Sequence, residues 1–230
     1  MKSTIISPTP IAVKVCGITS VQQAKQIALL GADAIGVVGV KGSPRYVDEK
    51  KRKEIFNEIN QTRENVQSVL VIANPNDESI KKNLAGVGQP TIVQLHGNES
   101  PSRCRDLKSK YPNKGWWKAI GIKSKDDIER AYDFLNIADV ILLDYSEGNK
   151  TGGTGKRIPI ELIKNAKIET PWWIAGGISS NGIEELLNSL NPNGVDASSR
   201  LETSPGIKDI TLVRDLINKV KKHNIAKEKN

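Results

Sequence analysis

The sequence has few cysteines, few aromatic residues and no long apolar run, and each shortage removes a class of protein. Its 230 residues include two cysteines, Cys16 and Cys104, which are too few for a disulfide framework and lack metal-site spacing. No stretch approaches the ~20 apolar residues that cross a bilayer, and residues 1–10 do not resemble a signal peptide. We therefore expect a cytoplasmic protein that is not held in a membrane.

The scarcity of aromatic residues also bears on the net charge of +8. Such a charge is compatible with nucleic-acid binding or with attraction of anionic substrates. However, aromatic residues make up only 4% of the chain, and no basic–aromatic alternation suggests a surface for base stacking. The lysines are scattered along helical segments, and only 219–229 forms a basic cluster. We favour a lysine-rich solvated surface and expect no nucleic-acid partner.

Short apolar runs alternate with longer amphipathic segments along the whole chain. The runs that read as strands are Ala12–Val15, Ala34–Val38, Ser68–Ile72, Thr91–Leu95, Trp116–Ile120, Val140–Leu143, Trp172–Ala175 and Gly194–Ala197. Eight strands separated by helices indicate a parallel sheet covered by helices. In a chain of this length, that count favours a closed (β/α)8 TIM barrel over an open doubly wound sheet.

The segments between these runs carry helix signals. Apolar residues at 183–190 and 213–220 follow the i, i+3, i+4, i+7 spacing of one helix face. Thr19 or Ser20 can cap the first helix, and Gly31 can end it. The helix after the fifth strand and the short segment after Pro159 carry the weakest signals.

No linker or change of composition divides the chain, so we expect one catalytic barrel domain over residues 11–221. Residues 1–10 then form an N-terminal extension and residues 222–230 a basic C-terminal tail. We expect both to be disordered, because chain ends without packing partners usually are.

Polar and small residues follow the predicted strands at the ends where barrel enzymes place their active sites. These residues are Cys16-Gly17, Gly39 to Arg45, His96-Gly97, Asp144, Gly176-Gly177 and Asp196 to Arg200. Taken singly, each has an ordinary structural interpretation: a small buried cysteine, a hydrogen-bonding histidine, a loop cap or a surface ion pair. Their joint placement at strand ends favours a catalytic site.

Three small-residue loops predict anion binding. Gly176-Gly177 and Ser198-Ser199 follow the last two strands, where barrels often bind phosphate through exposed backbone N–H groups. The third loop, 152–156, has the sequence GGTGK but lacks the spacing of a Walker A motif. The alternative for any one loop is that its glycines only form a tight turn.

An ordered set of motifs resembles the phosphoribosylanthranilate isomerase family. The motifs are Lys14-Val15-Cys16-Gly17-Ile18-Thr19, Gly42-Ser43-Pro44-Arg45-Tyr46-Val47, Val93-Gln94-Leu95-His96-Gly97, Leu142-Leu143-Asp144, the GGTGK loop, Ala175-Gly176-Gly177-Ile178, Gly194-Val195-Asp196-Ala197-Ser198-Ser199 and Ser204-Pro205-Gly206-Ile207-Lys208-Asp209. The chain departs from the family at Arg200, where the family usually has glycine, and in the less aromatic stretch 37–40.

The resemblance implies an intramolecular oxidoreductase of tryptophan biosynthesis. Its reaction is the Amadori rearrangement of N-(5'-phosphoribosyl)anthranilate to 1-(2-carboxyphenylamino)-1-deoxyribulose 5-phosphate. Asp144 matches the family's general acid and Cys16 its general base, while Arg45 matches the residue that holds the anthranilate carboxylate. His96 and Asp196 lie on the same rim and are expected to orient the substrate.

The same resemblance implies that the loops after the last two strands bind the phosphate end of the substrate. Gly176, Gly177, Ser198 and Ser199 are expected to bind its phosphate. No cofactor is expected, because the sequence contains no metal-ligand cluster and no dinucleotide fingerprint. The resemblance leaves monomer and homodimer open as oligomeric states.

A cysteine base needs help, because a free thiol with a pKa of about 8.5 is mostly protonated at neutral pH. Strand alternation places Lys14 on the same side as Cys16. We hypothesise that Lys14 lies inside the barrel, pairs with Asp196 or Asp144, and favours the thiolate.

Two alternatives stay open at this stage. One is a sister phosphosugar barrel, the histidine-pathway aminoimidazole carboxamide ribonucleotide isomerase, although Cys16 on the first strand argues against its Asp/Asp pair. The other is a non-catalytic basic barrel that binds nucleic acid, whose affinity would fall steeply with salt.

Overall fold

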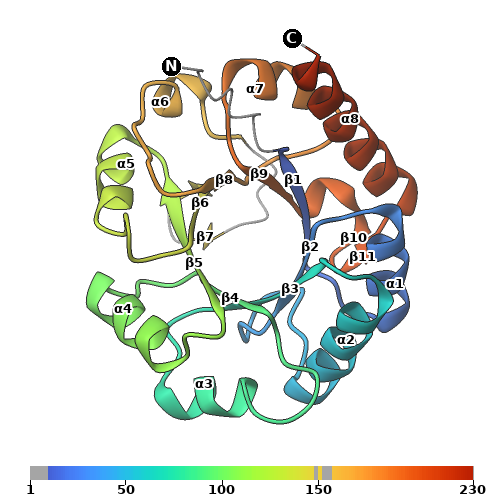
Figure 1. Ribbon diagram of the computed structural model, residues 1–230, viewed down its shortest axis with the longest axis vertical. Coiled ribbons are helices and arrows are strands. Elements are labelled where there is room, and N and C mark those ends of the chain that lie inside the picture. Colours follow the sequence, from blue (N-terminus) through green and yellow to red (C-terminus); the bar gives the residue numbers. More distant parts are fainter. Residues whose placement is uncertain (1–9, 148–149, 152–156, 230) are drawn as a thin grey trace, which may run out of the picture.

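The computed structural model describes residues 10–147, 150–151 and 157–229 (Figure 1). Most of the predicted N-terminal extension and the GGTGK loop at 152–156 lie outside the described residues. No helix in the described ranges is both long enough and apolar enough to cross a membrane.

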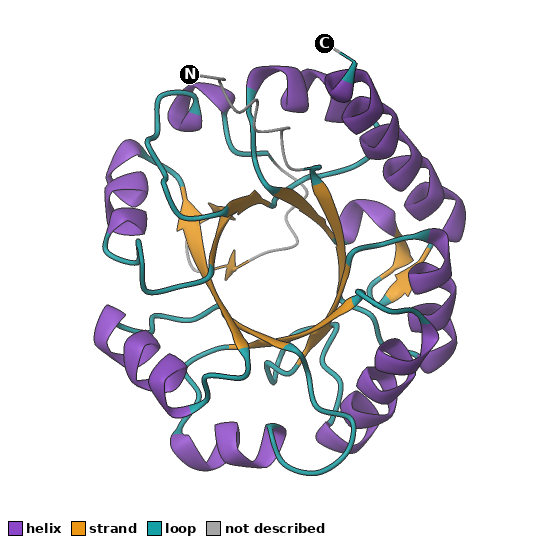
Figure 2. Ribbon diagram, in the orientation of Figure 1, coloured by secondary structure: helices purple, strands orange, loops and turns teal. Residues whose placement is uncertain are grey.

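A closed ring of eight parallel strands forms the centre of the protein, and the helices surround it (Figure 2). The strands are β1 (Ala12–Cys16), β2 (Ala34–Val38), β3 (Gln67–Ile72), β4 (Ile92–Leu95), β5 (Gly115–Ile122), β6 (Val140–Glu147), β8 (Trp172–Ile174) and β9 (Gly194–Ala197). They neighbour one another in chain order, β5 pairs with β6, and β9 pairs with β1 to complete the ring. The predicted (β/α)8 barrel is therefore confirmed.

The outer layer contains one helix for each barrel strand. The helices are α1 (Val21–Leu30), α2 (Glu49–Thr62), α3 (Asp77–Asn83), α4 (Pro101–Lys110), α5 (Lys125–Tyr132), α6 (Ile160–Ile163), α7 (Ile183–Ser189) and α8 (Ile210–Glu228). The first helix begins as its sequence predicts: the Ser20 side chain accepts a hydrogen bond from the N–H of Gln23, and Gly31 ends the helix in a left-handed conformation. α6, in the segment with the weakest signal, has only four residues.

The prediction of a disordered tail after Lys221 is wrong, because α8 continues to Glu228. The Asn224 side chain accepts a hydrogen bond from the N–H of Ile11 and donates one to its carbonyl, both at 3.0 Å. Lys227 donates to Asn191 at 2.6 Å. The basic composition suggested solvation, but these tertiary contacts hold the last turns of the helix against the barrel.

Four further short elements lie in the loops after β6 and β9. β7 (Lys150–Thr151) pairs antiparallel with the end of β6, and β10 (Glu202–Ser204) pairs with β11 (Ile207–Lys208). The one-turn helix η1 (Ser199–Leu201) lies directly after β9. Both loops therefore leave strand ends at the carboxyl-terminal rim of the barrel.

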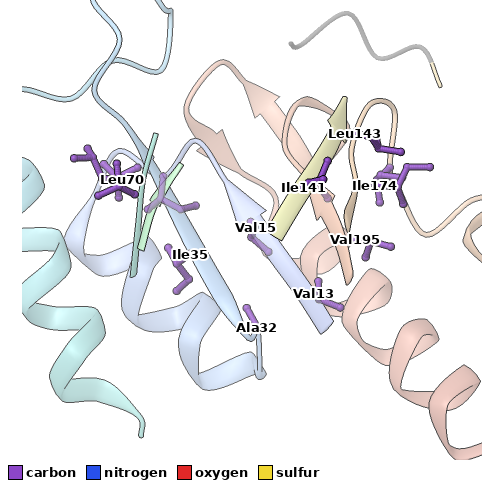
Figure 3. Close-up of a cluster of buried hydrophobic side chains, with 14 of the residues drawn as sticks. Val13, Val15, Ala32, Ile35, Leu70, Ile141, Leu143, Ile174 and Val195 are labelled. Atoms are coloured by element: carbon purple, nitrogen blue, oxygen red, sulfur yellow. The ribbon is translucent and has the colours of Figure 1, made fainter. Parts of the chain in front are cut away.

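Apolar side chains form two layers, one on each side of the strands. Between strands and helices lies the larger core, part of which is drawn in Figure 3 with Val13, Ile35, Leu70 and Ile141 among its labelled residues. Burial of such side chains is worth roughly 1.5–3 kcal/mol each.

The second layer fills the inside of the barrel. There the rings of Trp117 and Trp173 pack against each other, with 4.7 Å between their centroids and 49° between their planes. Gly194 is required beside them, since a Cβ there would lie 2.3 Å from the Trp173 ring. Trp117 and Trp173 are therefore packing residues that fill part of the barrel interior.

Candidate active site

A cavity of about 780 Å³ opens at the carboxyl-terminal rim, above the apolar filling of the barrel. It brings together all the residues that the sequence assigned to the site: Cys16, Arg45, His96, Asp144, Gly176, Gly177, Asp196, Ser198 and Ser199. They come from segments spread over more than 180 residues of the chain. Closure of the barrel is what makes them neighbours.

Lys14 lies inside the barrel, fully buried, on the same face of β1 as Cys16. Its Nζ donates to Asp196 Oδ2 at 2.7 Å, across the β1–β9 pairing in which these two residues are direct partners. Of the two partners that the sequence left open for Lys14, the structure therefore shows Asp196. The other oxygen of Asp196, Oδ1, is buried without a hydrogen-bond partner, so it can accept a hydrogen bond from a ligand.

Two opposing effects act on the Cys16 thiol. Burial raises its pKa above the ordinary value and Asp196 adds to that rise, while the ammonium groups of Lys14 and Lys208 oppose it. For Lys14, burial alone would lower the pKa, but Asp196 and Cys16 together raise it. Lys14 therefore stays a cation beside the sulfur, where its charge lowers the pKa of Cys16, although burial leaves the net pKa of the thiol raised.

Asp144 follows the apolar part of β6 and reaches the cavity with its carboxyl group largely buried. His96, after β4, approaches it with 3.4 Å between His96 Nε2 and Asp144 Oδ2. Gln94 in turn lies 3.4 Å from the other ring nitrogen of His96. The acid predicted at this position is thus flanked by a side chain that can orient it.

Gln94 also lines the cavity. It is part of the motif at 93–97, but no role was assigned to it from the sequence. It is 1% exposed, and its Oε1 is buried without a hydrogen-bond partner. The sequence offered one signal for this residue, an amide side chain in an otherwise apolar strand. Buried polar groups are normally paired, so such an amide indicates a partner, here a ligand in the cavity.

The loop that carries His96 is held from outside the barrel by a buried ion pair. Lys118 on β5 contacts Glu99 Oε2 at 2.9 Å and the carbonyl of Gly97 at 2.7 Å. Glu99 also accepts hydrogen bonds from the N–H groups of Asn74 and Gly97. These contacts fix the positions of the loops after β3 and β4.

Arg45 lies in the cavity wall, and its guanidinium is engaged by a residue that the sequence did not single out. Its Nε and Nη2 donate to the two carboxylate oxygens of Glu202 at 2.8 and 2.6 Å. Lys208 donates to the same carboxylate at 2.6 Å. Lys208 is part of the motif at 204–209, but nothing in the sequence indicated that Lys208 or Glu202 would contact Arg45. In the chain, 157 positions separate Arg45 from Glu202.

Small residues and backbone form another part of the cavity wall. Gly176 and Gly177 have φ angles of 88° and 63°, a left-handed region that favours glycine. Ser198 Oγ donates to the carbonyl of Cys16 at 3.0 Å, which joins this wall to the end of β1. Arg200 also lines the cavity, so the departure from the family's glycine places a cationic side chain beside the predicted phosphate loop.

The comparisons with known proteins agree with this geometry. A model of the family "N-(5'phosphoribosyl)anthranilate (PRA) isomerase" matches residues 13–219. The N-(5'-phosphoribosyl)anthranilate isomerase of Crocosphaera subtropica is 37% identical over 92% of this chain and 99% of its own length. That of a Sulfurihydrogenibium species is 38% identical over 91% of this chain and 98% of its own length.

Solved structures give the same result. Phosphoribosyl anthranilate isomerase from Thermotoga maritima superposes with a TM-score of 0.82 at 29% identity and covers 92% of this chain and 99% of its own. A second structure is of the isomerase in complex with reduced 1-(o-carboxyphenylamino)-1-deoxyribulose 5-phosphate. It has a TM-score of 0.78 at 28% identity, covering 92% of this chain and 99% of its own. The chain therefore belongs to the N-(5'-phosphoribosyl)anthranilate isomerase family.

Proposed function

We propose that this protein isomerises N-(5'-phosphoribosyl)anthranilate in tryptophan biosynthesis, with Asp144 as general acid and Cys16 as general base. Membership of the family confirms the predicted isomerase and decides against the sister barrel of histidine biosynthesis. The observation that carries the residue roles is that Cys16, with its buried cation Lys14, and Asp144, with His96 beside it, line one cavity.

The reaction needs two proton transfers. Asp144, protonated, gives its proton to the furanose ring oxygen, and the C1'–oxygen bond breaks as the nitrogen lone pair forms a Schiff base. Cys16, as the thiolate, removes the proton from C2', and the electron pair of that bond forms the enolamine. The enolamine becomes the ketone when its O–H proton moves to C1'. Atoms and electrons balance without an external oxidant or reductant.

The cavity offers separate contacts for the two charged ends of this substrate. Arg45 is a guanidinium suited to the anthranilate carboxylate. The backbone at 176–177 and 198–199 is suited to the phosphate, because barrels commonly bind phosphate through the N–H groups of these two loops. Asp196 Oδ1, buried and unpaired, can accept a hydrogen bond from a sugar hydroxyl. Such positioning holds the reacting carbons between Cys16 and Asp144.

Two wider expectations belong to the same proposal. We infer that the enzyme works in the cytoplasm, which its two free cysteines support. We also infer a monomer or a homodimer, since one solved relative is described as monomers generated from the dimeric enzyme of Thermotoga maritima.

The direct test is turnover of freshly generated phosphoribosylanthranilate, followed by the loss of its fluorescence. The purified protein should consume it, and Arg45→Ala should raise KM more than it lowers kcat, because the carboxylate contact would be lost. A folded protein that does not consume this substrate would refute the proposed function.

A further inference from the structure

The carboxylate of Glu202 lies between two cations at the edge of the active site. Arg45 contacts both of its oxygens, at 2.8 and 2.6 Å, and Lys208 contacts Oε1 at 2.6 Å. The side chain of Glu202 is 4% exposed and that of Lys208 is fully buried. Burial alone would raise the pKa of Glu202, but Arg45 and Lys208 hold it below the ordinary value. Glu202 is therefore ionised at neutral pH.

The aliphatic part of the Arg45 side chain packs closely against Gly17. A Cβ built on Gly17 would lie 2.5 Å from Cδ of Arg45 and 3.1 Å from Oγ of Ser198. The aliphatic part of Arg45 thus lies directly over the glycine that follows Cys16. Glu202 holds the charged end and Gly17 leaves room for the stem, so the long side chain is confined to one arrangement.

This arrangement leaves part of the guanidinium for another anion. A guanidinium has five N–H donors, and the contacts with Glu202 use the edge formed by Nε and Nη2. The edge formed by Nη1 and Nη2 can still meet a second carboxylate with two parallel hydrogen bonds. A side chain that is already ordered also loses less entropy when the ligand binds.

We propose that Glu202 is a positioning residue for substrate recognition, which holds Arg45 ready for the substrate's aromatic carboxylate, with Lys208 as its buried counter-cation. This inference rests on the proposed function, because it takes Arg45 as the carboxylate contact. It adds that recognition depends on a buried Lys208–Glu202–Arg45 chain and not on Arg45 alone. The chain carries one net positive charge toward an anionic ligand.

The test is a double-mutant cycle between Glu202→Gln and Arg45→Ala, with kcat and KM measured separately. Glutamine keeps the shape but removes the charge, so Arg45 loses its paired contact. We expect Glu202→Gln to raise KM on the order of 10-fold, the loss that one charge-assisted contact produces, with a smaller effect on kcat. In the Arg45→Ala background, Glu202→Gln should add little, because its effect passes through Arg45.

Two further variants keep the test sound. Glu202→Gln leaves Lys208 buried without its partner, so the double variant Glu202→Gln/Lys208→Met removes both charges and protects folding; it should show the same rise in KM. Glu58→Gln removes a carboxylate that pairs with Lys25 on the surface, and it should leave KM unchanged.

The outcomes separate this inference from the proposed function. If Arg45→Ala raises KM while the folded Glu202 variants do not, or if the two effects simply multiply, the positioning role of Glu202 is wrong and the assignment of Arg45 stands. If Arg45→Ala itself leaves KM unchanged, the assignment of Arg45 is wrong and the positioning role falls with it.

Discussion

Replacement of Lys14 by methionine should make the Cys16 thiol a weaker acid. Methionine keeps much of the length and volume of the lysine side chain but removes the ammonium group beside the sulfur. Burial and the Asp196 carboxylate would then raise the pKa of Cys16, opposed only by Lys208, whose charge has the smallest of these effects. The thiolate should therefore appear only at a higher pH than in the wild type.

The size of the shift follows from the separation of the two groups. Cys16 Sγ and Lys14 Nζ lie 2.6 and 3.1 Å from the point where a Cβ on Gly36 would stand, which puts them at most about 6 Å apart. At this distance, two unit charges interact by roughly 3 kcal/mol at an effective dielectric constant of about 20, which corresponds to about 2 pKa units. We expect a rise of that order.

The assay is the pH dependence of Cys16 alkylation by iodoacetamide, compared with the pH profile of kcat/KM. Burial raises the pKa of the second thiol, Cys104, to about 11, so it should react little with iodoacetamide. A Cys104→Ser background removes any contribution from it. Loss of Lys14 should move both curves to higher pH, and Lys25→Met on the surface of α1 should move neither.

An Asp196 left alone in the barrel strengthens the expected rise and also threatens folding. The double variant Lys14→Met/Asp196→Asn removes both charges, and its shift should be smaller than that of Lys14→Met. An unchanged or lowered pKa of Cys16 in folded Lys14→Met would refute the role assigned to the lysine.

Three further predictions concern stability and cofactors. Lys118→Met should lower the free energy of unfolding by about 3–5 kcal/mol, because Glu99 would be left buried and unpaired; a loss below about 1 kcal/mol in denaturant titration would contradict this. Trp173→Ala should cost about 3–5 kcal/mol by opening a cavity beside Trp117, and a melting temperature near that of the wild type would show that the barrel filling does not depend on it. Exhaustive chelation should leave turnover unchanged, since both proton transfers are assigned to side chains; abolition of activity that a divalent metal restores would show the assignment to be incomplete.

The sequence predicted the barrel well because its pattern is local. Each buried parallel strand is an apolar run of a few residues, and the polar interruption that follows marks the end where the active site forms. The pairing of Lys14 with an aspartate inside the barrel was also predictable, because the two-residue alternation of a strand places Lys14 on the same face as Cys16.

What the sequence left open depends on contacts between distant segments. The pairing of Arg45 with Glu202 joins two loops that only closure of the barrel brings together. The helical end of the chain depends on Asn224 meeting the start of β1, and a run of charged residues gives no sign of such a contact. Gln94 is the exception, because an amide in an apolar strand is a local signal, although no role was assigned to it from the sequence.

The assignment of Cys16 as base and Asp144 as acid is tested by comparing turnover of phosphoribosylanthranilate by the wild type, Cys16→Ala and Asp144→Asn. Cys104→Ala and Asp133→Asn serve as matched controls away from the cavity. We expect rapid turnover by the wild type and the controls, and a loss of about 100-fold or more in kcat for each site variant, as happens when a positioned acid or base is removed. Site variants that fold and retain wild-type kcat would contradict this assignment.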